Sequence, residues 1–435
     1  MQSYDEIVNS GTDWLGYIPA QWSIRRGKFL YQNKKVVNKG MAETQRLALT
    51  LRGVIERKDG DNLGLNPESL ESYQVFEKND LVFKLIDLEN KQTSRVGLTP
   101  KRGIMSPAYI RLTPKLALSP GYFFYYYYSL YLTYVFNNIA GEGVRANLSA
   151  KELLELPAPV PSLQTQQKIA DFLDTETAQI DNLIAKQERL LEMLEEKRRA
   201  TITHAVTRGL NPSVELKETN IPWLGQIPRH WGEVRVKHLV KELEAGTSVN
   251  ASSSSDDTGV YVLKTSAVYT RRFRADENKP VLASELHRVS CPVRKGAVVI
   301  SRMNTPELVG ASAYVEDEHS DIYLPDRLWQ TRYIDESAQD SRYLAYFFRL
   351  QGFRDQISLA AEGASSSMQT ISKNKFLNIK MACPATDEQK KISDYLDGYN
   401  KRNDLLMQKI QTQIALLRER RTSLISHAVT GKVMI

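Results

Sequence analysis

The chain has 435 residues, of which 42% are hydrophobic and 25% charged, which is typical of a globular protein large enough for two or three cores. Its formal net charge of +7 favours an anionic partner, with nucleic acid first. Cys291 and Cys383 are far apart and lack metal-site spacing, which argues against a disulfide framework or a zinc site and favours a reducing cytoplasm.

A tryptophan motif near the start of the chain occurs a second time. Residues 14–19 read WLGYIP and are followed by Trp22, and residues 223–228 read WLGQIP and are followed by Trp231. The motif therefore marks the start of two related units, which is the first sign of an internal repeat.

Each tryptophan motif is followed by a stretch that predicts a globular lobe. In the first lobe, residues 78–85, 95–97 and 108–112 are β-branched or aromatic runs between Gly, Pro or Asn, which predicts short strands. The tyrosine-rich run 121–136 predicts a helix, with 341–353 as its partner in the second lobe. The run is too short and too rich in tyrosine for a membrane span, so we expect its aromatic rings to pack in a core.

Each lobe is followed by a long stretch of strong helix formers. Residues 164–208 contain no Gly or Pro, and the segment 387–430 repeats them at a fixed offset of 223. Residues 169–174 (IADFLD) match 392–397 (ISDYLD), and HAVT ends both segments at 204–207 and 427–430. Apolar residues at coiled-coil spacing predict two long amphipathic helices of equal length.

Proline-rich edges set the expected domain boundaries. We predict a first lobe at 1–161, a first spacer helix at 162–208, a linker with the second lobe at 209–384, and a second spacer helix with a tail at 385–435. The serine-rich residues 250–257 predict an exposed loop.

The two helices predict a pair within the chain. Two equivalent units related by a two-fold axis place such helices antiparallel, and the alternative is that each helix packs only on its own lobe. The predicted interface consists of Ile169, Leu173, Ile180, Leu183, Leu190, Leu194, Ile392, Leu396, Leu406, Ile410 and Leu417. The predicted fold is therefore α+β, with two globular α/β domains joined by two long antiparallel coiled-coil helices in a pseudo-two-fold repeat.

The motifs of an enzyme are missing from the sequence. It contains no phosphate-binding loop of the GxxxxGK[ST] type, no convincing dinucleotide-binding turn and no usual metal-ligand spacing. His204 and His427 recur near helix ends, where they suit the helix dipole, but no nucleophile or metal partner accompanies them. We therefore expect a binding and scaffolding protein without catalytic residues, metal or cofactor of its own.

Basic side chains on predicted loops of both lobes are the candidates for DNA contact, because Arg, Lys and Asn bind base edges and phosphates. Lys84 and Arg302 follow matched strands, so related loops of the two lobes are both basic. The candidates are Lys34, Lys35, Lys84, Arg95, Lys101, Arg102, Arg145, Arg271, Arg272, Arg274, Arg302, Asn304 and Arg327.

This layout resembles the specificity subunit of type I restriction–modification enzymes. The tryptophan motifs, both HAVT endings, and the segments 106–109 (SPAY) and 324–328 (LPDRL) carry the resemblance, which covers essentially the whole chain. It implies that each lobe is a target-recognition domain for one half of a split DNA site, and that the antiparallel helices set the gap.

The resemblance also implies the partners. These are double-stranded DNA and two methylation subunits, which bind S-adenosylmethionine; two restriction subunits that use ATP and Mg²⁺ are a further option. The cysteine usage favours a cytoplasmic protein, and the tyrosine-rich run gives no reason to expect membrane contact. Two other classes stay open at this point: a coiled-coil adaptor whose lobes bind proteins rather than DNA, and a self-sufficient enzyme.

Overall fold

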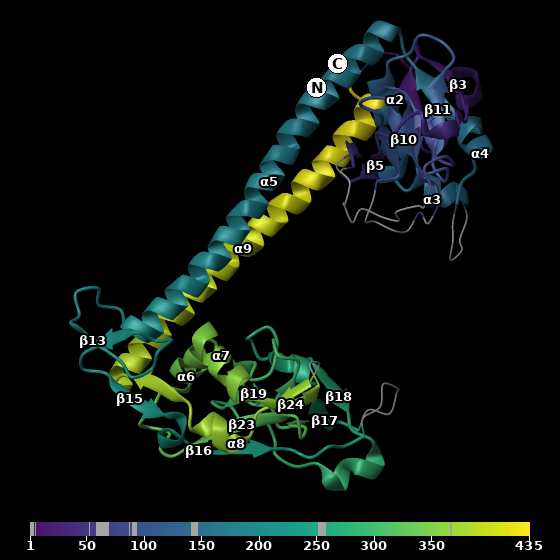
Figure 1. The fold of residues 1–435 in the computed structure, drawn as a ribbon. Helices are drawn as coiled ribbons and strands as arrows, with labels where there is room; N and C mark the ends of the chain where they lie inside the picture. Colours follow the sequence, from purple (N-terminus) through teal and green to yellow (C-terminus); the bar gives the residue numbers. More distant parts are fainter. Residues whose placement is uncertain are drawn as a thin grey trace. The chain divides into compact units, whose positions relative to one another are not determined.

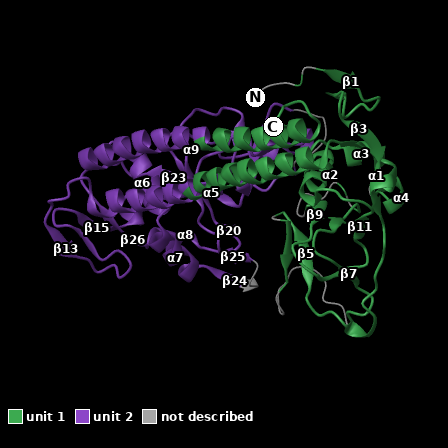
Figure 2. Cartoon of the chain, turned by 90° about the horizontal axis from the view of Figure 1, so that it is seen from above, with its two compact units in different colours: residues 1–189, 410–435 green, residues 190–409 purple. Residues whose placement is uncertain are grey.

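The structure is a computed structural model that describes residues 4, 6–51, 53–57, 69–86, 88, 94–140, 147–250, 258–365 and 368–435. The chain forms two compact units. Unit 1 consists of residues 1–189 and 410–435, and unit 2 of residues 190–409. Each unit contains one lobe and a part of both long helices, as the colours of Figure 2 show.

The two long helices are present at the predicted positions. Helix α5 is Leu163–Arg208 and helix α9 is Thr386–Val429, each within one residue of the predicted segment. They lie side by side in both units (Figures 1 and 2), and their contacts make them antiparallel. In unit 1, Asp181 pairs with Arg421 and Glu188 with Arg418, so the residue number rises along one helix as it falls along the other.

The first lobe is built on a four-stranded antiparallel sheet with the order β4-β11-β8-β9. Its strands are β4 (Tyr31–Gln32), β8 (Leu81–Phe83), β9 (Val96–Leu98) and β11 (Ile110–Pro114). The last three correspond to the three strands that the sequence predicts. All residues of β8 are buried, as the continuous apolar run LVF indicates for a central strand.

The second lobe repeats this topology. Its main sheet has the order β16-β23-β19-β21. The strands are β16 (Val240–Ala245), β19 (Val298–Ser301), β21 (Ser312–Tyr314) and β23 (Leu328–Tyr333). The fully buried β19 takes the place of β8. The internal repeat in the sequence is therefore a repeat of the fold.

The tyrosine-rich helix packs into the core of the first lobe, as predicted, but it ends at Leu132, and a separate helix α3 (Val135–Ala140) follows instead of one helix to residue 136. Helix α2 (Pro120–Leu132) begins at Ser119, whose side chain caps the backbone N–H of Tyr122. The buried rings of this helix are Tyr122, Phe123, Tyr125, Tyr126 and Tyr127. Its counterpart in the second lobe is α6 (Ser341–Phe348), which Asp340 caps. The predicted helix 341–353 is wrong in one respect: the chain turns at Leu350, and a separate helix α7 covers Gln351–Ala360.

Short strand pairs attach each lobe to the long helices. In unit 1 they are β1 (Ile7–Asn9) with β2 (Tyr17–Pro19), and β3 (Ser23–Arg26) with β12 (Pro157–Val160). In unit 2 they are β13 (Leu216–Glu218) with β14 (Gln226–Pro228), and β15 (Gly232–Arg235) with β26 (Lys380–Cys383). The two tryptophan motifs end in β2 and β14, so they occupy matching places.

Smaller elements complete the lobes. The first lobe also has α1 (Gly27–Leu30), η1 (Lys39–Met41), β5 (Leu47–Thr50), β6 (Gly53–Glu56), β7 (Gln74–Phe76), β10 (Gly103–Met105), α3 (Val135–Ala140) and α4 (Ala150–Glu155). The second also has η2 (Val236–His238), β17 (Tyr261–Leu263), η3 (Thr265–Val268), β18 (Asn278–Pro280), η4 (Ala283–Arg288), β20 (Met303–Asn304), β22 (Ile322–Tyr323), β24 (Glu362–Ser365), β25 (Met368–Thr370) and α8 (Lys373–Leu377). Of the predicted serine-rich loop, residues 251–257 lie outside the described residues.

Candidate DNA interface and helix pair

The basic residues that follow the matched central strands lie at equivalent places in the two lobes. Lys84 comes directly after β8 and Arg302 directly after β19, and both side chains are half-buried. The Arg302 guanidinium lies over the Trp329 ring at 6.0 Å from its centroid. Its backbone N–H donates to the carbonyl of Arg327, whose side chain is exposed. The structure thus brings Arg302 and Arg327 together beside one sheet.

Two of the candidates lie inside the protein. Arg95 is fully buried beside β9, and Asn304 is 8% exposed. The Asn304 amide donates to the hydroxyl of Tyr269 at 2.6 Å, and its carbonyl oxygen accepts from the backbone N–H of Thr305 at 2.9 Å. In this conformation neither residue can reach a duplex. The prediction of DNA contact is corrected for both, because both side chains lie inside the lobe.

The remaining candidates of the first lobe are on its surface. Lys34 and Lys35 are exposed after β4, whereas Lys101 pairs with Glu56 at 2.6 Å. Arg102 pairs with two carboxylates, those of Glu43 and Glu77. Arg145 lies outside the described residues. Phosphates of a duplex would have to displace protein carboxylates from Lys101 and Arg102. An exposed basic side chain without a carboxylate partner needs no such displacement.

The basic loop after η3 in the second lobe lies against the long helices within unit 2. Arg272 forms an ion pair with Asp404 of α9, and Asp404 also pairs with Arg198 of α5. Although burial acts to raise it, the pKa of Asp404 stays below its usual range because both guanidiniums stabilise the carboxylate. Arg274 pairs with Asp276 at 2.7 Å, and Arg271 is exposed. The loop is therefore fixed to the helix pair by Arg272.

The seam of the helix pair differs from the prediction by a shift of one residue in part of α5. Leu183 and Leu190 are 47% and 40% exposed, whereas their neighbours Ile184 and Leu191 are more buried. In α9, Leu406 is 44% exposed and Met407 faces inward instead. As contacts between the two helices, these three residues were wrong, because the inward face of α5 follows the positions 180, 184, 187, 191, 194 and 198, which include Gln187 and Arg198. As contacts to another subunit they stay a prediction. The predicted seam residues that are buried or partly buried are Ile169, Leu173, Ile180, Leu194, Ile392, Leu396, Ile410 and Leu417.

Each unit contains the same polar contact between the two helices with the roles of the helices exchanged. In unit 1, Arg421 of α9 pairs with Asp181 of α5 at 2.8 Å. In unit 2, Arg198 of α5 pairs with Asp404 of α9. Both pairs are related by the sequence offset of 223 found in the helices. The sequence carried this signal, since Arg198 matches Arg421 and Asp181 matches Asp404, but charged residues were not considered as seam positions.

A buried tyrosine in each lobe binds the end of the helix that comes from the other repeat. The Tyr122 hydroxyl donates to the carbonyl oxygens of Pro159 and of Val429 at the end of α9, at 3.1 and 3.0 Å. The Tyr343 hydroxyl donates to the carbonyl oxygens of Ala382 and of Val206 near the end of α5. Burial raises the pKa of both phenols well above the usual value, so both stay protonated as donors.

The glycine after each long helix explains why the tryptophan motif and the HAVT ending recur together. Gly209 and Gly431 have φ values of +76° and +72°, the left-handed conformation that commonly ends a helix. A Cβ atom on Gly431 would lie 2.3 Å from Cδ of Pro19, and one on Gly209 would lie 3.4 Å from the Trp231 ring. In each unit the tryptophan motif thus covers the end of a long helix.

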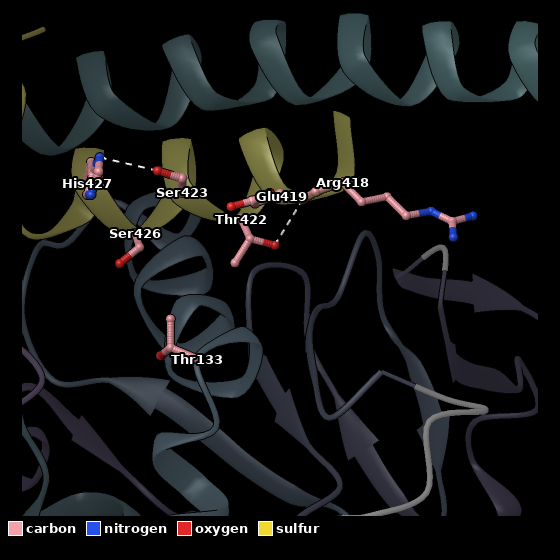
Figure 3. Close-up of a pocket in the computed structure, with 7 residues that line it drawn as sticks. All are labelled: Thr133, Arg418, Glu419, Thr422, Ser423, Ser426 and His427. Carbon is pink, nitrogen blue, oxygen red and sulfur yellow. Dashed lines mark hydrogen bonds between the residues drawn. The ribbon is translucent and has the colours of Figure 1, made fainter. Parts of the chain in front are cut away.

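A surface hollow lies along α9 in unit 1. It is lined by Thr133, Arg418, Glu419, Thr422, Ser423, Ser426 and His427 (Figure 3). Ser423 and His427 lie one helical turn apart, with Oγ and Nδ1 separated by 3.4 Å. In α5 the residue one turn before His204 is Ala200, so the pair is not repeated. Arg418 is paired with Glu188.

Two features are absent from the described residues. No group of three or more His, Cys, Asp or Glu side chains is arranged to hold a metal ion among them. Within the same ranges, every helix is too short or too polar to cross a membrane.

Comparison with known proteins decides the family. The profile of the family described as "Type I restriction modification DNA specificity domain" matches residues 23–193 and 228–416. The two matches cover both lobes and most of both long helices, well over half of the chain. The chain belongs to this DNA specificity family.

Relatives of this type I DNA specificity family match along most of the chain. The type I restriction enzyme MjaVIII specificity subunit of Methanocaldococcus jannaschii is 23% identical over 338 residues, which are 77% of this chain and 75% of the relative. The EcoKI specificity subunit of Escherichia coli is 22% identical, over 70% of this chain and 63% of the relative.

The fold has a solved counterpart. A chain from a structure of a type I R-M system superposes with a TM-score of 0.70 at 15% identity, over 96% of this chain and 99% of that one. The predicted fold and the predicted function in DNA target specificity are confirmed, and the comparisons do not support the adaptor alternative.

Proposed function

We propose that this chain is the non-catalytic subunit that reads a bipartite DNA target in a type I restriction–modification complex. The observation that carries the proposal is the doubled fold of a chain in the DNA specificity family. Two lobes have one sheet order, and each binds the end of the other repeat's helix through a buried tyrosine. Two equivalent lobes on one chain suit a target made of two separate halves.

We propose further that the helix pair sets the gap between the two half-sites. The 46 residues of α5 correspond to roughly 70 Å of helix at 1.5 Å per residue. Duplex DNA rises about 3.4 Å per base pair, so a spacer of this length is long enough for half-sites more than one helical turn apart. Shortening both helices by the same number of residues would then shorten the gap.

Methylation subunits are the proposed partners on the outside of the helix pair. Large apolar side chains are exposed on both helices, and their exposure to water is unfavourable, which is typical of a surface that another protein covers. They are Leu183, Leu190 and Met193 of α5 and Leu405, Leu406 and Leu416 of α9. The repeat would offer one such surface to each of two copies. S-adenosylmethionine would be bound by the methylation subunits, and ATP and Mg²⁺ by restriction subunits where these join.

Selection of DNA by the assembled complex tests the function. The chain would be purified with its methylation subunits and used to select from a random duplex library at two salt concentrations. We expect a two-part motif with a fixed gap, and affinity that falls steeply with salt because phosphate contacts release counterions. The methylation subunits alone are the control and should select no motif. Failure of the assembled complex to enrich any motif would contradict the proposal.

A further inference from the structure

Arg271, in the loop after η3, lies within electrostatic range of arginines from two other parts of unit 2, namely Arg199, Arg349 and Arg354. Arg199 comes from α5, Arg271 and Arg272 from the loop after η3, and Arg349 and Arg354 from the α6–α7 region. Burial is the main cause that lowers the pKa values of Arg271, Arg349 and Arg354. Neighbouring arginines add to it: Arg271 and Arg272 act on Arg349, Arg271 on Arg354, and Arg199 on Arg271. The carboxylates of Asp397, Asp355 and Glu195 act in the opposite direction on Arg349, Arg354 and Arg271, respectively. We call these five residues the arginine cluster.

Arg349 is the most enclosed member, and the carboxylate of Asp397 is near enough to raise its pKa. Its guanidinium stacks at 5.4 Å from the centroid of the Tyr346 ring, and its buried Nε has no hydrogen-bond acceptor. No described residue forms an ion pair with it. Burial lowers its pKa to about 10, so it remains charged at neutral pH although the charge is costly to bury. A partly exposed, charged guanidinium whose buried Nε has no acceptor suits a site whose anion comes from another molecule.

Arg354 lies half-buried one helix later in the same surroundings. It donates through Nη2 to the backbone carbonyl of Glu307 at 2.7 Å, which fixes its position without neutralising its charge. Burial, with Arg271 nearby, lowers its pKa to about 10 as well. Both guanidiniums keep their charge in poorly hydrated positions near Arg271, so both add to the positive potential there.

Arg271 is held next to these two by the loop that carries it. Its backbone has a φ of +63°, which side-chain-bearing residues rarely adopt. The following residue, Arg272, is tied to Asp404 of α9, and Phe273 packs against the lobe. Arg271 itself is exposed, and no described residue forms an ion pair with it. The constrained turn therefore holds a charged side chain at the edge of the cluster.

The cluster stands out from the other arginines around it. Arg342, one turn before Tyr346, is surrounded by the carboxylates of Asp340, Asp394 and Asp397. Arg274 pairs with Asp276 and Glu277. Carboxylates are thus available in this part of the fold, yet Arg271, Arg349 and Arg354 form no ion pair with any described residue. A purely structural set of arginines would be expected to use them.

We propose that Arg271, Arg349 and Arg354 form a binding site for phosphates of the DNA backbone, positioned against the helix pair by Arg272. The inference rests on the proposed DNA-reading function and adds the residues that would hold the duplex without reading its sequence. Guanidinium groups match phosphate geometry with two parallel hydrogen bonds. The duplex carries one charge per about 1.7 Å of its axis, so several neighbouring phosphates can contact several arginines at once. An isolated carboxylate of a protein partner can contact only one or two of them.

The test uses the complex of the full chain with its methylation subunits and its selected target duplex. Dissociation constants would be measured across a salt series for wild type, Arg349→Gln/Arg354→Gln and Arg271→Gln, with thermal unfolding as a check of folding. Each lost phosphate contact should reduce the slope of log K against log salt by about 1, and affinity should fall equally for the target and for a scrambled duplex. Arg288→Gln is the matched control, because exposed Arg288 pairs with Glu285 and should leave both slope and affinity unchanged.

The outcomes separate this inference from the proposed function. An unchanged slope in folded Arg271→Gln and in the double variant, with the wild-type motif still selected, would overturn the phosphate site and leave the function standing. Weaker binding of the methylation subunits with normal DNA affinity of the assembled complex would make the cluster a protein interface and also overturn it. If Arg349→Gln/Arg354→Gln does not fold, Arg271→Gln alone decides through its slope. Absence of any motif for wild type would instead count against the proposed function.

Discussion

A buried ion pair in the first lobe illustrates how single residues decide its stability. Arg111 of β11 donates through Nε to Asp80 at 2.6 Å, and both side chains are almost fully buried. We expect Asp80→Asn to lower the free energy of unfolding by about 3–5 kcal/mol, because it leaves a buried guanidinium without its counter-charge. The measurement is the urea unfolding of the full chain. Glu77→Gln, which removes a largely exposed pair with Arg102, is the control and should change little. Equal losses for both would contradict the expectation.

The buried tyrosines that bind helix ends give a second test with single atoms. Removing the hydroxyl in Tyr122→Phe leaves the carbonyl oxygen of Val429 without this donor, and Tyr343→Phe does the same to that of Val206. Each change should cost about 1–2 kcal/mol of stability, the usual effect of leaving one buried hydrogen-bonding group unsatisfied. Urea unfolding of the full chain measures it. Tyr17→Phe, at an exposed ring, is the control. No loss in either buried variant would show that these hydrogen bonds do not fasten the helix ends.

At the scale of the elements, the helix pair should distinguish inward from outward residues one turn apart. Ile180 is 4% exposed in the core that unites α5 with the end of α9, whereas Leu183 is 47% exposed. We expect Ile180→Ala to lower the free energy of unfolding by about 2–4 kcal/mol through the cavity it leaves. Leu183→Ala should change it by less than about 0.5 kcal/mol in the isolated chain. Denaturant unfolding of both variants compares them, and a larger effect for Leu183 would mean that the predicted seam was right after all.

The same helix pair shows what the sequence could and could not predict. The repeat, both long helices and the central strands followed from hydrophobic periodicity and from the Gly, Pro and Asn residues between segments, because both signals depend on local residue order. The seam did not, since Leu183 and Ile184 are equally apolar and only the partner helix selects between them. The burial of a basic residue also cannot be predicted from its residue type, and Arg95, which was expected on the surface, is buried. Arg349 and Arg354 were missed because they lie in a stretch rich in aromatic residues, where core packing was the only expectation; the signal was two arginines among those rings.

At the scale of the whole molecule, the proposed spacer role of the helices has a test that keeps the seam intact. Deleting residues 182–188 from α5 and 414–420 from α9 removes one heptad from each helix, so the seam keeps its phase. The deletion takes out both members of the Glu188–Arg418 pair and keeps Asp181 with Arg421. Seven residues correspond to about 10 Å of helix, or about three base pairs of duplex. We therefore expect the selected target to keep both half-sites with a gap shorter by about three base pairs.

The control for this deletion keeps the length and removes the same contact. Glu188→Gln/Arg418→Gln loses the ion pair between exposed side chains without shortening either helix, so its selected gap should equal that of wild type. Both variants would be selected against random duplexes after assembly with methylation subunits has been verified. An assembled deletion variant that keeps the wild-type gap would show that the spacing is set outside the helix pair. A shorter gap in the deletion variant alone would establish helix length as the determinant, because both variants lose the Glu188–Arg418 ion pair and only the deletion shortens the helices.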